Sequence, residues 1–161
     1  MDHRPYPMPN NDRPCLDNIM QGLGSRGFID PPTIDDRRRA AVALVLSKDV
    51  DTALDLLFIE RVHHPKDPWS GHIAFPGGGT ESHDLEPRDT AERETLEELG
   101  LDLRDSTCLG HLANLEAANA PVLVSGFVYA TDQHPRLVAS SEVADAFWIG
   151  LDALADPAVV R

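Results

Sequence analysis

The sequence predicts an α/β (α+β) domain in which one long helix packs against a mixed β-sheet. Three observations predict this class: short apolar segments with strand composition, one long helical segment between them, and a composition typical of folded proteins. The chain has 161 residues, of which 42% are hydrophobic and 25% are charged. That length fits one domain, and a disordered acidic chain would contain fewer apolar residues.

The first part of the chain, residues 1–36, is predicted to form an irregular arm. It holds six of the thirteen prolines and shows no sustained hydrophobic period. A short helix is expected within it, at residues 15–20. Residues 22–27 match the letters of a dinucleotide-binding fingerprint, but such a loop follows a strand and opens a helix, whereas two prolines follow here. We therefore reject a dinucleotide site in the arm.

Three strands are expected before the long helix. The apolar run at 40–46 predicts a buried strand, and the three arginines at 37–39 are expected to form a solvated edge. Residues 54–61 are mostly apolar and predict a second, central strand. Residues 72–75 predict a short strand that a proline ends, and the glycines at 77–79 are expected to form a loop.

The long helix is expected to begin at Asp84 or Glu86 and to end at Leu99. Its interior is rich in Ala, Glu, Arg and Leu, which favour helices. Pro87 is tolerated in a first helical turn, and Gly100 stands where a left-handed residue commonly ends a helix.

Further strands are expected after the helix, at residues 108–115, 121–130 and 146–149. Gly126 lies inside the middle one and predicts a β-bulge there. The order of strands, helix and strands favours a layered domain with one crossover helix.

Three glutamates of the predicted helix share one face. At 100° per residue, Glu94, Glu97 and Glu98 fall within an arc of about 100°. Like charges at this spacing repel each other, whereas Mg²⁺ prefers such oxygen ligands, so a metal site is one interpretation of the cluster. Arg93 flanks Glu97 and is expected to support a carboxylate from outside the metal's ligand set. The other interpretation is a solvated Glu-rich surface, which is common on helices.

The glycines at 77–79 favour the metal site over the solvated surface, because a glycine-rich segment lets backbone approach a ligand closely. No Gly-Lys-Ser/Thr sequence follows them, so they do not form a P-loop. A phosphate-rich ligand would therefore be held through a metal ion rather than by a lysine.

The acidic charge of the chain restricts its partners. A net charge of −13 repels nucleic acid polymers and anionic membranes, and we expect neither as a partner. No apolar run is long enough to span a membrane, and the N-terminus lacks the pattern of a signal peptide. The two cysteines provide no disulfide framework, so we expect a cytoplasmic protein.

Residues 93–101 read Arg-Glu-Thr-Leu-Glu-Glu-Leu-Gly-Leu. This segment resembles the second half of the box of the Nudix hydrolases, G-x5-E-x7-R-E-U-x-E-E-x-G-U with U apolar, and departs only in Thr95. The resemblance implies a Nudix hydrolase domain over residues 37–161, built as an α/β/α sandwich with a mixed sheet. Related proteins continue past Trp148 into a further helix, which we expect to be missing here. The arm or a second subunit would then cover that face, or the chain is shortened; we favour a homodimer.

The first half of the box departs further from the family's pattern. One alignment places Leu85 at the box glutamate and Gly79 at the box glycine. The other pairs Gly78 with Asp84 and leaves one additional residue before Arg93. Both alignments leave the three helix glutamates in place.

Three more segments resemble the Nudix subgroup that contains coenzyme A pyrophosphatases, at residues 57–61, 69–78 and 141–148. Within the first two segments, Arg61, Trp69 and His72 are predicted to bind the substrate. The sequence of these two segments differs from the signature associated with coenzyme A cleavage, so coenzyme A is one candidate among several.

The resemblance implies hydrolysis of a diphosphate bond in a small molecule, a nucleoside diphosphate linked to another group X. The implied ligands of Mg²⁺ or Mn²⁺ are Gly78, Glu94, Glu97 and Glu98. Glu94 and Glu98 are also predicted to be catalytic. Glu142 is predicted to accept the proton, with Glu116 as the second candidate. The alternative function is a Nudix-fold sensor that binds a nucleotide without turnover.

Overall fold

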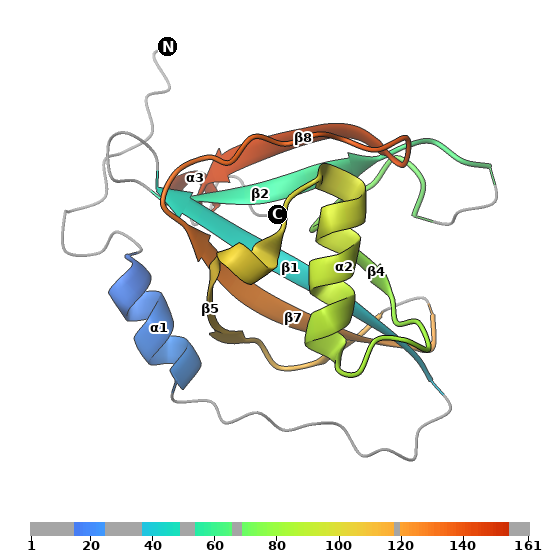
Figure 1. Ribbon diagram of the computed structural model, residues 1–161, viewed down its shortest axis with the longest axis horizontal. Helices are drawn as coiled ribbons and strands as arrows, with labels where there is room; N and C mark the ends of the chain where they lie inside the picture. The colour runs from blue at the N-terminus through green and yellow to red at the C-terminus, as the bar shows by residue number, and fades with distance from the viewer. Residues whose placement is uncertain (1–14, 25–36, 49–53, 66–68, 118–119, 155–161) are drawn as a thin grey trace, which may run out of the picture.

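The computed structural model describes residues 15–24, 37–48, 54–65, 69–117 and 120–154. In these ranges a mixed sheet is covered by helices (Figure 1). The elements in chain order are α1 (Leu16–Gly24), β1 (Arg38–Lys48), β2 (Leu54–Arg61), β3 (Ile73–Ala74), β4 (Gly77–Gly79), α2 (Pro87–Leu99), the 3₁₀ helix η1 (Leu103–Asp105), β5 (Thr107–His111), β6 (Leu115–Glu116), β7 (Val122–Thr131), β8 (Val143–Gly150) and α3 (Leu151–Leu154).

The sheet has the strand order β3-β2-β1-β7-β5. β1 and β7 are parallel, with Arg38 opposite Val122 and Ser47 opposite Thr131. The other pairs are antiparallel, and β4, β6 and β8 join β1, β7 and β2 respectively. A mixed sheet with α2 as the long helix confirms the predicted fold class.

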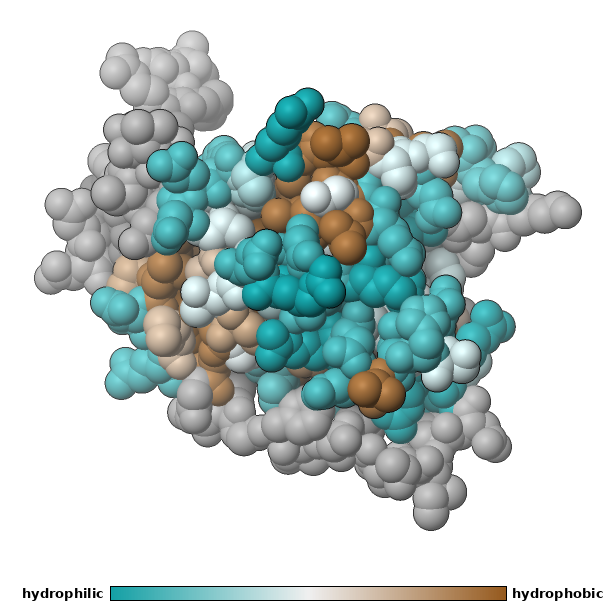
Figure 2. Space-filling view, viewed as in Figure 1, coloured by the Kyte–Doolittle hydropathy of each residue, from teal (hydrophilic) through white to brown (hydrophobic). Residues whose placement is uncertain are grey.

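One face of the sheet packs against α2. Side chains alternate along β1, so that Ala41, Ala43 and Val45 lie in the core on this face. The cluster that they form with α2, η1 and the neighbouring strands also contains Leu57, Ile59, Ala91, Leu99, Leu101, Leu103, Phe127, Tyr129 and Val143. Figure 2 shows mainly hydrophilic residues over the outward surface of α2. The apolar side chains of the helix face the sheet, except for the exposed Leu96.

The opposite face of the sheet carries a second cluster, formed by Leu46, Leu56 and Val128 together with Leu23 of α1. Partly buried side chains of α1 and α3 pack against it, including Leu16, Ile19, Leu151 and Leu154. The helix predicted at 15–20 is therefore present and extends to Gly24. In the described part of the chain, α1 and α3 are the helices on this face.

The ends of α2 follow the sequence signals. Pro87 is the first helical residue, and the Asp89 carboxylate accepts the N–H of Glu86 at 3.1 Å in a capping arrangement. At the other end Gly100 takes the left-handed conformation, with φ 64°, and its N–H donates to the carbonyl of Leu96.

Two expectations about the strands were wrong. The glycines at 77–79 form strand β4, which pairs with β1, rather than a loop. No bulge interrupts the register at Gly126, and the irregularity lies in β5 between Cys108 and Gly110. In both cases pairing with a distant strand decided the local conformation. Arg38, from the arginine run expected at a solvated edge, begins β1 and is exposed.

The helices that the structure describes are all too short or too polar to cross a bilayer.

Candidate active site

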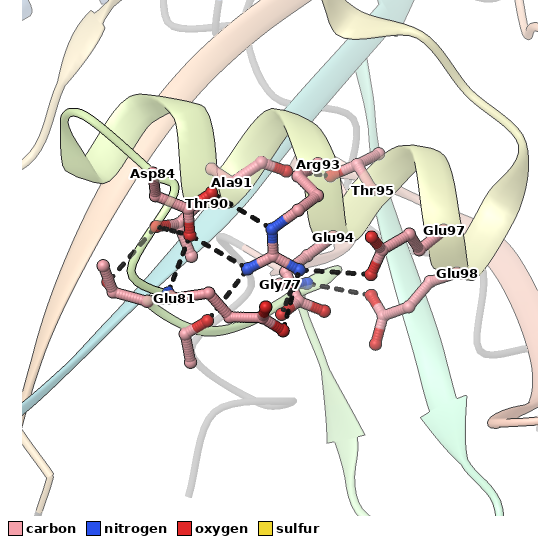
Figure 3. A network of polar contacts seen from close by, with 12 residues as sticks. Gly77, Glu81, Asp84, Thr90, Ala91, Arg93, Glu94, Thr95, Glu97 and Glu98 are labelled. Carbon is pink, nitrogen blue, oxygen red and sulfur yellow. Dashed lines mark hydrogen bonds and ion pairs between the residues drawn. The ribbon is translucent and has the colours of Figure 1, made fainter.

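The site lies where the carboxylate face of α2 meets strand β4. Pairing with β1 places the glycines of β4 beside the helix, and Figure 3 shows Glu94, Glu97 and Glu98 turned toward that strand and Arg93. Glu98 is buried, Glu94 is half-buried, and the Glu97 side chain is 59% exposed. The three carboxylates therefore differ in their exposure to water, although they share one helix face.

Glu98 is held from two sides. Its Oε2 accepts the N–H of Gly77 at 2.9 Å, and its Oε1 lies 4.0 Å from the guanidinium of Arg61 at the end of β2. Burial raises the pKa of Glu98 to about 7, and the charges of Glu94 and Glu142 act in the same direction. A carboxylate in this environment favours the approach of positive charge.

Glu94 lies directly against the backbone of Gly78. A Cβ added at Gly78 would lie 2.5 Å from both Cδ and Oε1 of Glu94, so only glycine leaves room for that carboxylate. Burial raises the pKa of Glu94, and the neighbouring charges of Glu97 and Glu142 raise it further. Close contact with β4 thus fixes the position of this side chain.

Arg93 connects the glutamates to the turn before α2. One of its nitrogens, Nη1, donates to Glu94 Oε1 at 3.0 Å and to Glu97 Oε2 at 3.1 Å. Nη2 donates to the carbonyl of Gly79 and to Asp84, each at 3.0 Å, and Nε donates to Asp84 at 3.1 Å. Arg93 therefore does more than the predicted support of one carboxylate (Figure 3).

Asp84 is the partner that orients Arg93. Its side chain is almost fully buried and accepts bonds from Arg93, from the Thr90 hydroxyl and from the N–H of Glu81. The Arg93 guanidinium holds the pKa of Asp84 well below its usual range. Leu85 is 94% exposed. Of the two alignments of the box, these contacts agree with the one that pairs Gly78 with Asp84.

Glu142 reaches the site from the start of β8. Its carbonyl accepts the N–H of Val62 at 3.0 Å, just beyond β2. Its side chain is exposed, and its charge contributes to the raised pKa values of Glu94 and Glu98. Glu116, the second candidate for proton acceptor, lies on β6 and pairs with Arg37.

The predicted substrate-binding residues lie together at the end of β2. Arg61 donates its N–H to the carbonyl of His72, and its own carbonyl accepts the N–H of Gly71. His72 in turn donates its N–H to the carbonyl of Trp69. This turn places the exposed side chains of Trp69 and His72 near Arg61, which is adjacent to Glu98.

The arrangement of donor groups at the site bears on metal binding. In the described part of the chain, no group of three or more His, Cys, Asp or Glu side chains is arranged so that it could hold a metal ion. Arg93 instead bonds to two of the predicted ligands. The donor set nevertheless fits a hard cation, because it consists of carboxylate oxygens and backbone beside a glycine that leaves room for Glu94.

Sequence reasoning missed the bond between Gly77 and Glu98, since it placed these glycines in a loop. Consecutive glycines signal close approach of backbone, but the partner strand is more than thirty residues away, and no local pattern identifies it. The sequence identified Asp84 only through the second of the two box alignments, because its bond to Arg93 depends on the direction in which its side chain points.

Solved structures with similar folds include two that are described as Nudix proteins and one described as an Ap4A hydrolase. A Nudix hydrolase from M. smegmatis, RenU, has a TM-score of 0.62 and 23% identity, covering 74% of each chain. A C. elegans Ap4A hydrolase in a binary complex has a TM-score of 0.60 and 20% identity, over 71% of this chain and 81% of that one. The Nudix domain of Shewanella oneidensis NrtR, complexed with ADP-ribose, has a TM-score of 0.58 and 19% identity, over 78% and 80%. These likenesses show a shared fold.

Sequence comparison leads to the same family. An uncharacterized protein of Schizosaccharomyces pombe, C14C4.10c, is 37% identical over 63% of this chain and 33% of its own length. The chain thus spans about a third of that curated relative. The sequence model of the Nudix domain matches residues 36–161, which include every site residue described above. The chain therefore belongs to the Nudix family.

Proposed function

We propose that this chain is a Nudix pyrophosphohydrolase that cleaves a diphosphate bond in a nucleoside diphosphate linked to another group X. The observation that carries the proposal is the packing of Glu94 against Gly78, next to the buried Glu98 bonded to Gly77. This packing places carboxylates of different exposure and raised pKa beside backbone that a phosphate ligand can approach closely.

The cation in this proposal is Mg²⁺ or Mn²⁺. Glu94, Glu97, Glu98 and the carbonyl of Gly78 would hold it. Such a cation neutralises phosphate charge and lowers the pKa of an attacking water. It also explains how a chain with a net charge of −13 could bind a polyanion. The bonds of Arg93 to Asp84 and Gly79 do not involve these ligands, so they can orient the arginine when the cation is bound.

The chain's own groups supply the remaining steps. Glu142 accepts the proton of the attacking water, because its backbone is fixed beside the end of β2 and the charge of its exposed side chain acts on Glu94 and Glu98. Arg61 binds phosphate oxygens beside Glu98, and the exposed Trp69 and His72 contact the rest of the substrate.

The identity of X is a finer part of the proposal. The resemblance of residues 57–61 and 69–78 to the subgroup that contains coenzyme A pyrophosphatases supports coenzyme A as one candidate. The structural neighbours add others, since one is described as an Ap4A hydrolase and another as a domain complexed with ADP-ribose.

We propose a cytoplasmic homodimer. Light scattering at micromolar concentration tests the assembly, and a strictly monomeric mass contradicts it.

A mass-spectrometric screen of Mg²⁺-dependent hydrolysis tests the function. The substrates are coenzyme A, dinucleoside polyphosphates, ADP-ribose, nucleotide sugars and NADH. Glu98→Gln should abolish turnover and keep the fold, as judged by circular dichroism, because the amide cannot provide the negative charge. Glu92→Gln on the same helix is the matched control, since Glu92 bonds to Tyr129 and Arg88 away from the site.

The screen distinguishes the two candidate functions. Cleavage of one diphosphate bond by the wild type and by Glu92→Gln, but not by Glu98→Gln, supports the enzyme and identifies its substrate class. Binding of a nucleotide without turnover across the panel favours the sensor. Near-normal activity of Glu98→Gln contradicts the proposed metal ligands.

A further inference from the structure

The segment before β8 docks onto the C-terminal end of α2. The N–H of Val138 donates to the carbonyl of Leu99, and the N–H of Ser140 donates to the carbonyl of Glu98, each at 2.8 Å. The last carbonyls of an α-helix have no partner within the helix, so this segment satisfies two of them. The left-handed Gly100 allows the approach, because the Val138 side chain lies beside it.

Ser140 makes three bonds at this place, and they lead in different directions. Its N–H binds the backbone of Glu98, the residue whose carboxylate is buried in the site. Its Oγ accepts the N–H of Glu142 at 3.3 Å, and its carbonyl accepts the N–H of Val143 at 3.3 Å. Ser140 thus joins the tight turn that includes Glu142 to α2, next to the Val138 bond to Leu99.

Glu142 is held on its other side by β2, because its carbonyl accepts the N–H of Val62. The position of its side chain relative to α2 therefore depends on two attachments, one to β2 and one to Ser140. Rotation of the turn would move the Glu142 carboxylate relative to Glu94 and Glu98, whereas the rest of β8 is fixed by its ladder with β2.

We propose that Ser140 is a positioning residue, which links the Glu98 backbone to the N–H of Glu142 and so fixes where Glu142 stands relative to the helix carboxylates. The inference rests on the proposed function, in which Glu142 accepts the proton of the attacking water. Ser140 does not itself act on the substrate. Its hydroxyl acts through Glu142, so its loss should affect the chemical step rather than binding.

Four variants test this role: Ser140→Ala, Ser140→Thr, Glu142→Gln and the double variant S140A/E142Q. Steady-state hydrolysis is measured with the panel substrate that the wild type cleaves, beginning with ADP-ribose. Ser140→Ala should lower kcat about three- to tenfold and leave KM unchanged, since it removes one hydrogen bond. Ser140→Thr keeps the hydroxyl and should restore kcat. The exposed neighbour Ser141→Ala is the matched control and should behave like the wild type.

The double variant separates positioning from general structural damage. If Ser140 acts through Glu142, the kcat of S140A/E142Q equals that of Glu142→Gln alone. Once the Glu142 carboxylate is absent, a change in the position of residue 142 no longer affects the rate. Multiplicative losses overturn the inference, and so does a wild-type kcat for Ser140→Ala beside a slow Glu142→Gln. A wild-type kcat for Glu142→Gln also overturns it, together with the proposed proton acceptor. A wild type that cleaves no substrate of the panel contradicts the proposed function itself.

Discussion

Gly78 is the residue at which the site depends most directly on the absence of a side chain. Gly78→Ala would place a Cβ 2.5 Å from the Glu94 carboxylate, the movable end of a flexible side chain. We expect kcat to fall about tenfold or more while the free energy of unfolding changes little, because Glu94 can rotate away but then leaves its place in the site. Steady-state kinetics and urea denaturation measure the two quantities.

Gly79→Ala is the control for that prediction, since a Cβ there meets nothing within 4 Å. It should keep most of the activity. Equal losses in the two variants would indicate that alanine disturbs β4 in general. An unchanged kcat in Gly78→Ala would show that the position of Glu94 does not matter for turnover.

The Asp84–Arg93 pair should make part of the stability depend on pH. Asp84 has a lowered pKa in the folded chain, whereas an aspartate in the unfolded chain titrates near about 3.9. The folded state therefore binds fewer protons than the unfolded state. The stabilisation that Asp84 contributes is fully present above the unfolded pKa and is lost as the pH falls toward the folded pKa. Asp84→Asn lacks this titration.

We accordingly expect wild type and Asp84→Asn to differ most in free energy of unfolding near neutral pH, and the difference to shrink below about pH 4. Urea denaturation between pH 3 and pH 7 measures it. A difference that stays constant over this range would contradict the assignment of Asp84 as the charged partner of Arg93.

Strand β4 shows how an element of three glycines is stabilised by its neighbour. Gly77 has φ 151°, and a Cβ there would lie 2.3 Å from the carbonyl oxygen of Ala41 on β1. Gly77→Ala must therefore move backbone rather than a side chain. We expect a loss of roughly 2–4 kcal/mol in the free energy of unfolding, as for other overpacked sites, measured by chemical denaturation. A stability equal to that of Gly79→Ala would contradict the close pairing of β4 with β1.

The elements themselves differ in how well the sequence predicted them. Residues 54–61 and α2 follow local signals, namely a run of apolar residues, a proline in the first turn and a glycine at the end, so their bounds agree closely. β4 has no side chains to form a pattern, and its identity comes from pairing with β1. The expected bulge at Gly126 failed for the same reason, since β1 pairs evenly along β7 there.

At the scale of the whole molecule, α1 couples the N-terminal region to the sheet. Leu23 is buried in the second core cluster, and a Cβ on Gly110 of β5 would lie 3.3 Å from it. Leu23→Ala should therefore destabilise the protein by about 1–3 kcal/mol, through lost burial and a cavity. Met20→Ala on the same helix is the control, because Met20 is largely exposed.

Denaturant unfolding of both variants checks this coupling. Equal, small effects would mean that α1 contributes little to the stability of the sheet. The Nudix model begins at residue 36, so α1 lies outside the part of the chain that the family shares. The packing of Leu23 is accordingly a feature of this chain that the family's box does not predict.

By itself, the sequence determined that three glutamates and Arg93 lie on one helix of a mixed α/β domain, because helical periodicity and capping are local properties. Only the tertiary structure decided which groups meet these residues. Strand pairing placed Gly77 and Gly78 against Glu98 and Glu94, and a segment more than forty residues along the chain attached Ser140 to the end of the helix. Such contacts join segments that are far apart in the sequence, so the local spacing of residue types does not predict them.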